Sequence, residues 1–413
     1  MLITLSGRGP FILILATALS ARAQAPETLS LRQALDLSQI DNPVLMASDA
    51  QIASRIGLRD QAALKPNPRI VVQQENAQFW GGTGLNYWRE TDTYLYGAMV
   101  VERGGKRERR IEAAGAAVAT ANEERNIAGA RLRGRVASAY WSAAGAASVL
   151  ALYREDLGTL GRIVEYNRQR VAEGKAAGVD LLKIEVERER MAAAALRAQQ
   201  DADLTRIALF RAMVRPDSPR VVLTESLEAI PDVRIASVVE ALRMRPEVRA
   251  AQASVDEAAE KVCLQQANAK TDPEYQFGFK RALGFNTLYA AVSLPLPVRN
   301  RNQGNISAAE ADMRTAQHSL EAIRNDASAE FEAASAAYRA KREAFEKTLT
   351  PLRAKARETA RIMLAAYREG GVDILQFLDA ERTRIETEVL WLQSLADIQQ
   401  SIVALKLAEG ESL

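Results

Sequence analysis

The chain has 413 residues and a formal net charge of +2 at pH 7, with 54 Lys and Arg against 52 Asp and Glu. This balance gives no support for binding nucleic acid, which normally needs a basic surface. A single cysteine, Cys263, and a single histidine, His318, exclude an intrachain disulfide and every CxxC-type motif, and argue against a zinc or copper site.

Residues 1–23 have the pattern of a secretory signal peptide. Arg8 supplies a positive charge, an apolar run starts at Phe11, and Ala21-Arg22-Ala23 fits an A-x-A cleavage site before Gln24. The apolar run has about half of the roughly 20 residues that a membrane anchor needs, although an anchor is the alternative. No cysteine lies nearby, which excludes a lipoprotein anchor. No later apolar run reaches spanning length, so we expect an exported chain without a transmembrane helix.

The first half of the mature chain predicts helices interrupted by two short strands. Pro43 suits the first turn of a helix, and Lys65-Pro66-Asn67-Pro68 stops that helix. The next long segment holds no proline and keeps apolar residues at a spacing of three and four, typical of a coiled-coil seam. The expected elements are helices over 29–42, 43–65, 106–172 and 179–214, strands over 68–80 and 91–102, and a proline-rich linker over 215–234.

The same order of motifs recurs about 200 residues later. We therefore expect two structural repeats, residues 24–220 and 221–413, because this period is too long for a solenoid module. A helix of about 65 residues is roughly 100 Å long and must pack side by side with others. The expected elements of the second half are helices over 246–270, 303–369 and 374–409, and strands over 273–281 and 287–295.

The strand segments have the character of membrane-crossing strands. Tyr275, Phe277 and Phe279 alternate with polar Gln276 and Lys280, which is a period of two. The segments have the length of a tilted membrane strand, and about half of the aromatic residues lie in and around them, as in aromatic girdles. Two hairpins packed on a soluble core are the competing interpretation. In the first half, the residues sharing a face are Tyr94, Tyr96, Ala98 and Val100, while Ile70 and Val72 lead into polar residues.

Four strands in lipid would leave unpaired N–H and C=O groups at both edges of the sheet, at several kcal/mol each. The sheet must therefore close, and the smallest membrane barrels have about eight strands. Two chains would give eight strands with a filled interior, and three would give twelve with room for a lumen. We expect an oligomer, and the alternative of a cytoskeletal or scaffolding coiled coil is less compatible with the strands.

Several motifs resemble the TolC family of outer-membrane efflux channels, over nearly the whole mature chain. These are Leu31-Arg32-Gln33-Ala34-Leu35 with Asn42-Pro43, the run from Leu294-Pro295-Leu296-Pro297 to Asn300-Arg301-Asn302-Gln303-Gly304-Asn305-Ile306, and two turns from Gly to a Leu-Leu-like pair. Glu102-Arg103-Gly104-Gly105-Lys106-Arg107 is similar to the Czc-type branch, which serves heavy-metal and cation efflux.

The resemblance implies a mainly α fold with a small β part, in which a homotrimer closes a 12-stranded outer-membrane β-barrel. A long α-helical barrel then continues into the periplasm. The implied role is a passive exit duct for metal cations or small toxic compounds. The implied partners are outer-membrane lipid, a periplasmic adaptor (membrane fusion) protein and an inner-membrane pump of the RND type. No cofactor and no nucleic acid are implied.

The resemblance also places a gate at the periplasmic tip. Asp180 and Tyr367 match residues that hold the tip closed, and Asp379 matches a pore-facing acidic ring, with Glu369 and Asp373 nearby. Two positions depart from the pattern, since Gln376 replaces a second pore Asp and Val372 replaces a gate Arg. Simple N-capping by Asp180 and Asp373 is the alternative. The glycines that would allow tight turns and adaptor contact are Gly174, Gly178, Gly370 and Gly371.

No residue pattern supports an enzyme: there is no GxSxG, no P-loop and no metal-ligand cluster, and we expect His318 to lie on a helix surface. The alternative function is a periplasmic coiled-coil adaptor or scaffold protein of a transport complex. An adaptor normally carries one helical hairpin within β-rich domains, whereas this sequence predicts two hairpins and little strand.

Overall fold

The computed structural model describes residues 27–77 and 91–411. The expected signal peptide and its cleavage site lie outside the described residues, as do the aromatic residues Phe79, Trp80, Tyr87 and Trp88. The first half contains β1 (Glu27–Leu29), α1 (Leu31–Gln39), α2 (Pro43–Ala62), β2 (Arg69–Glu75), β3 (Asp92–Val100), α4 (Lys106–Ala172) and α5 (Gly178–Ala212). The second half contains β4 (Val221–Leu223), α6 (Val238–Met244), α7 (Pro246–Asn268), β5 (Glu274–Ala282), β6 (Phe285–Ser293), α8 (Gln303–Ala344), the π-helical turn η1 (Phe345–Leu349), α9 (Thr350–Arg368) and α10 (Ile374–Glu409).

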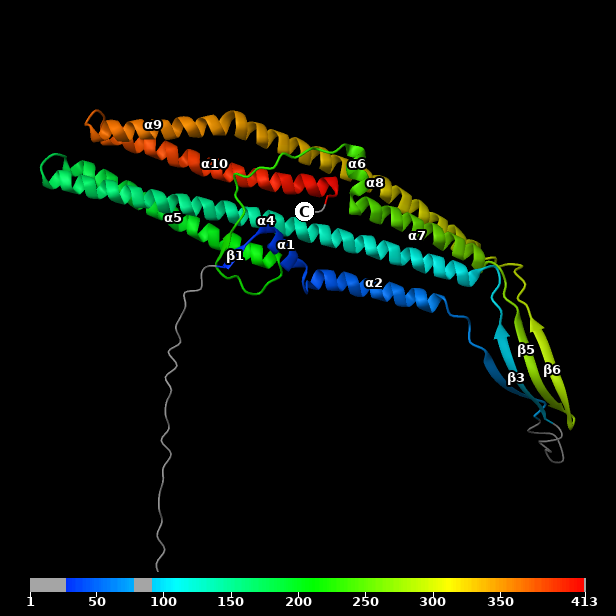
Figure 1. Cartoon of the computed structure of the whole chain (residues 1–413). Coiled ribbons are helices and arrows are strands. Elements are labelled where there is room, and N and C mark those ends of the chain that lie inside the picture. The colour runs from blue at the N-terminus through cyan, green and yellow to red at the C-terminus, as the bar shows by residue number, and fades with distance from the viewer. Residues whose placement is uncertain (1–26, 78–90, 412–413) are drawn as a thin grey trace, which may run out of the picture.

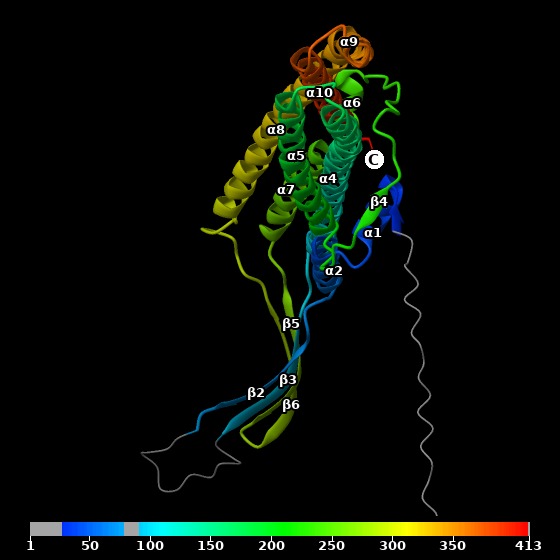
Figure 2. The same cartoon turned by 90° about the vertical axis from the view of Figure 1, so that its left-hand side faces the viewer.

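The described chain forms an elongated rod of helices with a sheet at one end (Figure 1). The turns from α4 to α5 and from α9 to α10 lie together at the other end, which we call the tip. Figure 2 shows that the strands extend beyond the helices, and among the described residues no helix covers either face of the sheet. The mainly α architecture with a small sheet part, expected from the sequence, is confirmed.

The segment expected to form a helix over 303–369 is helical throughout, but it is not a regular α-helix, because the π-helical turn η1 lies between α8 and α9. Pro351 lies in the first turn of α9 and has no N–H to donate, and a proline ring crowds the carbonyl four residues earlier. The extra residue of a π turn absorbs this clash. The Thr350 hydroxyl also donates to the Phe345 carbonyl, at 3.0 Å.

The segment expected to be only a linker, 215–234, contains a strand. In it, β4 pairs in parallel with β1, with Thr28 opposite Val222, so a two-stranded sheet joins the two halves of the chain.

The expectation that no apolar run after the signal peptide reaches spanning length also needs correction. Part of α4 is long and apolar enough to cross a membrane by length and composition alone. Of that window, 44% is buried inside the structure, as for the core helix of a helical bundle.

The four-stranded sheet is antiparallel throughout, in the order β2-β3-β5-β6. Cross-strand partners share a face, and Phe277 lies between Gly97 on β3 and Ala290 on β6. The face that holds Phe277 is apolar yet open to solvent in the single chain, with Ile70 84%, Phe277 64% and Leu288 69% exposed. The large apolar side chains of this face, which we call the outer face, are Ile70, Val72, Leu95, Met99, Tyr275, Phe277, Phe279, Leu288 and Val292.

The opposite, inner face is polar and less exposed. Tyr289 contacts Tyr94 edge to face, with ring centroids 5.4 Å apart, and also contacts Tyr96. The alternation predicted for β5 is confirmed. These three tyrosines lie on the inner face, where Tyr289 contacts both of the others, so they do not share a face with Phe277.

Gly278 on β5 leaves no room for a side chain. A Cβ at this position would lie 2.2 Å from the Leu95 carbonyl oxygen and 2.4 Å from the Tyr96 Cα on β3. Tyr96 and Tyr289 flank Gly278 in the register of the sheet.

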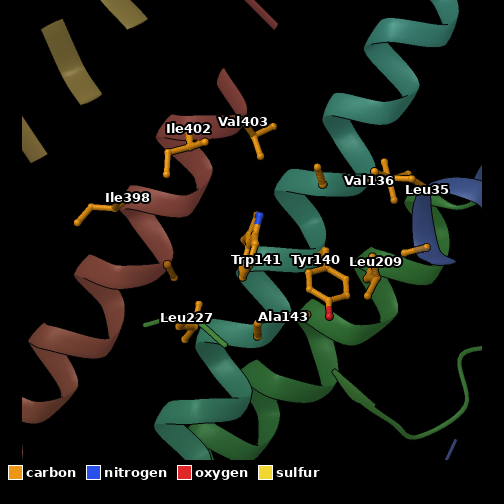
Figure 3. Packing of buried hydrophobic residues seen from close by; sticks show 14 of the residues in the cluster. Leu35, Val136, Tyr140, Trp141, Ala143, Leu209, Leu227, Ile398, Ile402 and Val403 are labelled. Carbon is orange, nitrogen blue, oxygen red and sulfur yellow. The ribbon is translucent and has the colours of Figure 1, made fainter. Parts of the chain in front are cut away.

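The helices bury three apolar clusters, of which the smallest joins α7 to α8 through Val248, Ala251, Leu320 and Ala327. The mid-body cluster lies where α4, α5 and α10 meet α1 and the segment after β4, and includes Tyr140, Trp141 and Ile398 (Figure 3). The hydroxyl of fully buried Tyr140 is satisfied, since it donates to the Leu29 carbonyl at 3.0 Å and accepts from the Glu225 amide at 3.2 Å. The tip cluster contains Leu160, Ile163, Val164, Ile184, Met191, Tyr367, Ile374, Phe377, Leu378 and Ile385.

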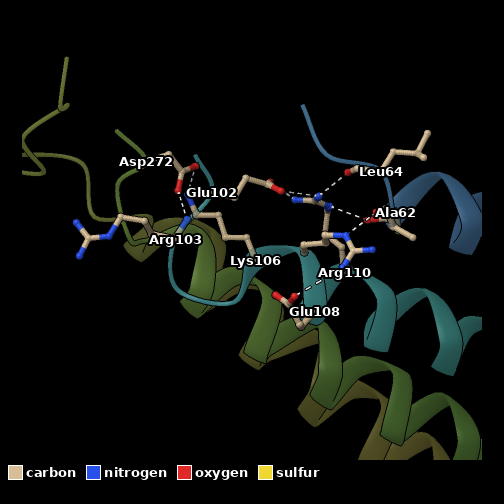
Figure 4. A network of polar contacts seen from close by, with 10 residues as sticks. Ala62, Leu64, Glu102, Arg103, Lys106, Glu108, Arg110 and Asp272 are labelled. Atoms are coloured by element: carbon tan, nitrogen blue, oxygen red, sulfur yellow. Dashed lines mark hydrogen bonds and ion pairs between the residues drawn. The ribbon is translucent and has the colours of Figure 1, made fainter. Parts of the chain in front are cut away.

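Polar contacts fix the sheet to the helices at the point where β3 becomes α4 (Figure 4). The Lys106 ammonium lies 2.6 Å from the Asp272 carboxylate, which also accepts the Arg103 amide at 2.8 Å. Arg110 bonds to Glu102 and to the end of α2. Gly104 adopts φ +76°, and a Cβ there would meet the Lys270 side chain. The motif resembling the Czc-type branch is therefore the elbow that sets the direction of the sheet.

Candidate functional site at the helical tip

The tip consists of two turns of the same construction. Gly174 follows α4 with φ +68° and Gly370 follows α9 with φ +79°, a left-handed conformation that strains other residues. In each turn the next residue donates back into the helix, from Lys175 to the Arg170 carbonyl and from Gly371 to the Ala366 carbonyl, both at 2.8 Å. These are glycine C-caps of the Schellman type.

The other two predicted tip glycines have a different setting. A Cβ at Gly178 would meet nothing within 4 Å, and one at Gly371 would come no closer than 3.5 Å to its neighbours. Neither has the positive φ of Gly174 and Gly370. The fold of the single chain therefore does not require glycine at positions 178 and 371, which leaves contact with another molecule as a reason for it.

Asp373 and Gln376 form a capping box at the start of α10. The Asp373 carboxylate accepts the Gln376 amide at 2.8 Å, and the Gln376 side chain accepts the Asp373 amide at 3.4 Å. N-capping is therefore correct for Asp373 and wrong for Asp180. Asp180 lies in the first turn of α5 after the N-cap Ala177, with its carboxylate 3.4 Å from the Lys183 ammonium.

Tyr367 is buried and joins the two hairpins. Its hydroxyl donates to the side chain of Asn167 on α4, and its ring stacks on Phe377 with centroids 5.5 Å apart. Burial raises the pKa of Tyr367, and the nearby charge of Asp180 raises it further. The partner Asn167 was not singled out in the sequence, although a polar residue on the apolar seam of a long helix is the signal that marks it.

A groove of about 660 Å³ lies between the tip ends of α5 and α10. Its apolar wall includes Val179, Leu182 and Leu375, which are all more than half exposed. Asp379 is exposed beside this wall, and Arg382 crosses the groove to Glu187 at 2.8 Å. The structure thus brings Asp379 and Gln376 together on one groove, while Asp180 and Tyr367 lie at its margin and beneath it.

A second buried link joins the hairpins closer to the mid-body. Arg384 on α10 bonds to Asp156 on α4 and to Glu381, both at 2.6 Å. Asp156 is only 5% exposed, and its second oxygen has no hydrogen-bond partner among the described residues. Burial raises the pKa of Asp156, and the charge of Arg384 opposes this only in part. Glu381 bonds to the same guanidinium, so the charge of Arg384 offsets only part of the effect of burial on the pKa of Asp156.

No set of metal ligands is assembled by the described part of the chain: no group of three or more His, Cys, Asp or Glu residues there could hold an ion. Glu369 and Asp379 are exposed, and Asp373 is engaged in its capping box. His318 lies on the surface of α8, near Glu321. Within the described residues, the tip offers a groove with charged side chains rather than a coordination site.

Comparisons with known proteins agree with one another. Residues 34–213 match the model of the outer membrane efflux protein family. The chain is 27% identical over 388 residues to the cobalt-zinc-cadmium resistance protein CzcC of Cupriavidus metallidurans, covering 92% of this chain and 89% of that one.

Solved structures show the same fold. A membrane protein from Pseudomonas aeruginosa is similar with a TM-score of 0.76 and 21% identity, covering 94% of this chain and 91% of that one. The open state of the MtrE outer membrane channel of Neisseria gonorrhoeae is similar with a TM-score of 0.75 and 19% identity, covering 92% and 89%.

The raised pKa of Asp156 predicts a pH-dependent stability. Because its folded pKa lies above the ordinary 3.8, the protonated form suits the folded state, and stability is lost as pH rises through the folded pKa. We expect Asp156→Asn to unfold at a higher denaturant concentration than wild type at pH 7, and the difference to vanish below pH 3.8. Equilibrium unfolding in detergent at both pH values measures this. An equal difference at both would contradict it.

Proposed function

We propose that the chain belongs to the outer membrane efflux protein family, whose model matches residues 34–213, and that it forms the outer-membrane channel of a tripartite efflux system. Its sheet lies in the outer membrane and its helices extend into the periplasm. It acts as a passive exit duct for substrates that an inner-membrane pump of the RND type and a periplasmic adaptor deliver. The adaptor or scaffold alternative is not favoured, because the family match is to an outer-membrane efflux protein.

The observation that carries this proposal is the inverted polarity of the four-stranded sheet. In a water-soluble protein the apolar face of a sheet is buried, but here the face with Phe277 and Leu288 is the exposed one. Among the described residues no helix lies over it. An apolar outer face with a polar inner face is the arrangement of a strand in a membrane barrel with an aqueous lumen.

The edges of the same sheet support a homotrimer. Within the described residues β2 and β6 each pair on one side only, so each leaves a row of N–H and C=O groups that lipid cannot satisfy. Joining β6 of one protomer to β2 of the next closes the sheet, and three protomers give twelve strands around a lumen. We also propose that residues 24–220 and 221–413 are structural repeats, since each holds the order β-α-α-β-β-α-α apart from the η1 interruption.

The tip would be the closed end of this duct. Asp180 and Tyr367 would help to hold the periplasmic end closed through contacts between helices, and Asp379 would face the pore. Three exposed copies of Asp379 make a narrow opening favourable to cations. Gln376 adds no charge, because its side chain completes the cap of α10. Gly174, Gly178, Gly370 and Gly371 would be the adaptor-contact turns.

The proposed substrate class, metal cations, rests only on the name of a similar protein. The similar protein of Cupriavidus metallidurans is named for resistance to cobalt, zinc and cadmium, which supports metal cations as substrates here. In this role the chain needs no cofactor and performs no catalysis.

The inverted sheet predicts opposite effects of a charge on its two faces. Phe277→Arg places a cation on the outer face, which costs about 2–4 kcal/mol near the middle of a bilayer. We expect this variant to be lost from the outer-membrane fraction and from cross-linked trimers. The matched control is Gln276→Arg on the adjacent inner face, which should insert and trimerise as wild type does. Equal behaviour of the two variants, or recovery of wild type as a soluble periplasmic monomer, would contradict the proposal.

The acidic tip predicts a loss of cation preference on neutralisation. Asp379→Asn removes the proposed ring of charge, while Asp379→Glu keeps it. In planar bilayers we expect Asp379→Asn to lower the ratio of cation to anion permeability and to weaken blockade by divalent cations, with Asp379→Glu close to wild type. Unchanged selectivity and blockade in Asp379→Asn would remove Asp379 from the pore.

A further inference from the structure

Four short connectors join the helices to the four-stranded sheet, and they lie at one level of the rod (Figures 1 and 2). The connectors are residues 63–68, 101–105, 269–273 and 294–302. Together they hold five basic and two acidic residues. Both acidic residues are already paired with cations of α4, since Asp272 lies 2.6 Å from the Lys106 ammonium and Glu102 bonds to Arg110. The five basic residues are therefore an uncompensated excess of positive charge.

The basic residues of the connectors have no carboxylate partner. All five are exposed, and none of them forms an ion pair within the described residues. They are Lys65, Arg103, Lys270, Arg299 and Arg301. The Arg103 guanidinium points away from Asp272 and Glu102 (Figure 4), and the side chain of Lys270 lies against Gly104, the residue after Arg103. The elbow thus brings together two cationic residues from different connectors, and exposed like charges of this kind favour an anionic partner.

The connectors also expose apolar side chains beside these cations. Leu296 is 74% and Val298 is 77% exposed, and Val298 directly precedes Arg299. The other exposed apolar residues of the connectors are Leu64, Val101 and Leu294. Apolar and cationic side chains on one surface are the pattern of an interfacial membrane anchor. In such an anchor the apolar groups enter the boundary between headgroups and acyl chains, and the cations attract anionic lipid.

The length of the strands puts the connectors at the edge of the hydrocarbon. β5 and β6 have 9 residues each. At roughly 3.4 Å per residue and a tilt of about 35–45°, such a strand rises about 22–25 Å, close to the apolar band of about 25 Å in membrane barrels. The Val101 amide donates to the Pro273 carbonyl at 3.0 Å, so the connectors continue directly from the strands. With the outer face in lipid, the connectors lie at the level of the headgroups.

We propose that the four connectors form a basic collar that binds the headgroups of anionic phospholipids in the leaflet facing the periplasm. The exposed apolar residues of the connectors enter the edge of the acyl region, and the five unpaired cations attract the headgroups. Because Lys106 and Arg110 tie the connectors to α4, lipid bound at the collar also fixes the depth of the sheet. This inference rests on the proposed function, which places the sheet in the outer membrane, and it adds a lipid partner to that sheet.

Quenching by brominated lipid measures which lipid surrounds the collar. With Cys263→Ser as background, Val298→Cys carries a fluorophore at an exposed position of the collar, in vesicles of phosphatidylcholine and phosphatidylglycerol. The lipid composition stays fixed, and the bromine is placed either on the anionic phosphatidylglycerol or on an equal amount of zwitterionic phosphatidylcholine. We expect the anionic lipid to quench about threefold more strongly at low salt. This ratio should fall towards one at high salt, because salt screens exposed charges.

Matched variants separate the collar from the net charge of the protein. Lys270→Gln, Arg299→Gln and Arg301→Gln together remove three charges of the collar and should bring the ratio close to one. The control removes three exposed charges of α5 and α9 that also lack an ion pair within the described residues, and it should keep the wild-type ratio. It combines Arg211→Gln, Lys355→Gln and Arg368→Gln. A third variant, with Lys270→Arg, Arg299→Lys and Arg301→Lys, keeps the charge of the collar and should also keep the ratio.

The collar is overturned if wild type quenches equally with both lipids, if its preference does not respond to salt, or if the neutral variant and the control behave alike. If the neutral variant does not assemble, loss of the preference in the charge-keeping variant overturns the collar. A fluorophore at position 277 separates this from the proposed function. No quenching there by either brominated lipid contradicts the placement of the sheet in the membrane, and the collar falls with it. Quenching at position 277, with equal quenching by the two lipids at position 298, refutes the collar alone.

Discussion

The rest of this structure depends on one constraint: a sheet of four strands can neither cover its own apolar face nor pair the backbone groups of its two edge strands. The sheet exposes its apolar face, and within the described residues β2 and β6 each pair on one side only. Water disfavours the apolar face, and lipid disfavours the unpaired edges. The closed sheet that we propose, shared between copies of the chain with lipid outside and water inside, would satisfy both. The polar inner face with Tyr94, Tyr96 and Tyr289 would then line the lumen.

In the proposed channel, the helices carry the closed sheet at one end and form the tip at the other. The elbow formed by Lys106, Asp272 and Arg110 fixes the direction in which the strands leave the helices. The mid-body cluster joins both halves of the chain through β1, β4 and Tyr140. Beyond it, apolar packing weakens and the hairpins are joined by a smaller cluster and by buried polar links.

Much of this could be predicted from the sequence, because period and punctuation are local signals. The alternation along β5, the helix start at Pro43 and the tip glycines each reflect one residue and its near neighbours. The misses are of another kind. Pro351 acts through a carbonyl one turn away, and β4 forms only because β1 lies beside it. Asn167, Asp156 and Arg384 acquire their roles from partners about 200 residues distant in sequence, which no local pattern reveals.

The most direct test of the central claim is the depth and orientation of β5 in a bilayer. Single-cysteine variants at positions 274–277, 279 and 280, in a Cys263→Ser background, can carry a fluorophore in vesicles whose lipids have brominated acyl chains. An outer face in contact with lipid predicts strong quenching at 275, 277 and 279 and weak quenching at 274, 276 and 280. Uniform quenching along the strand, or none at the odd positions, would contradict it.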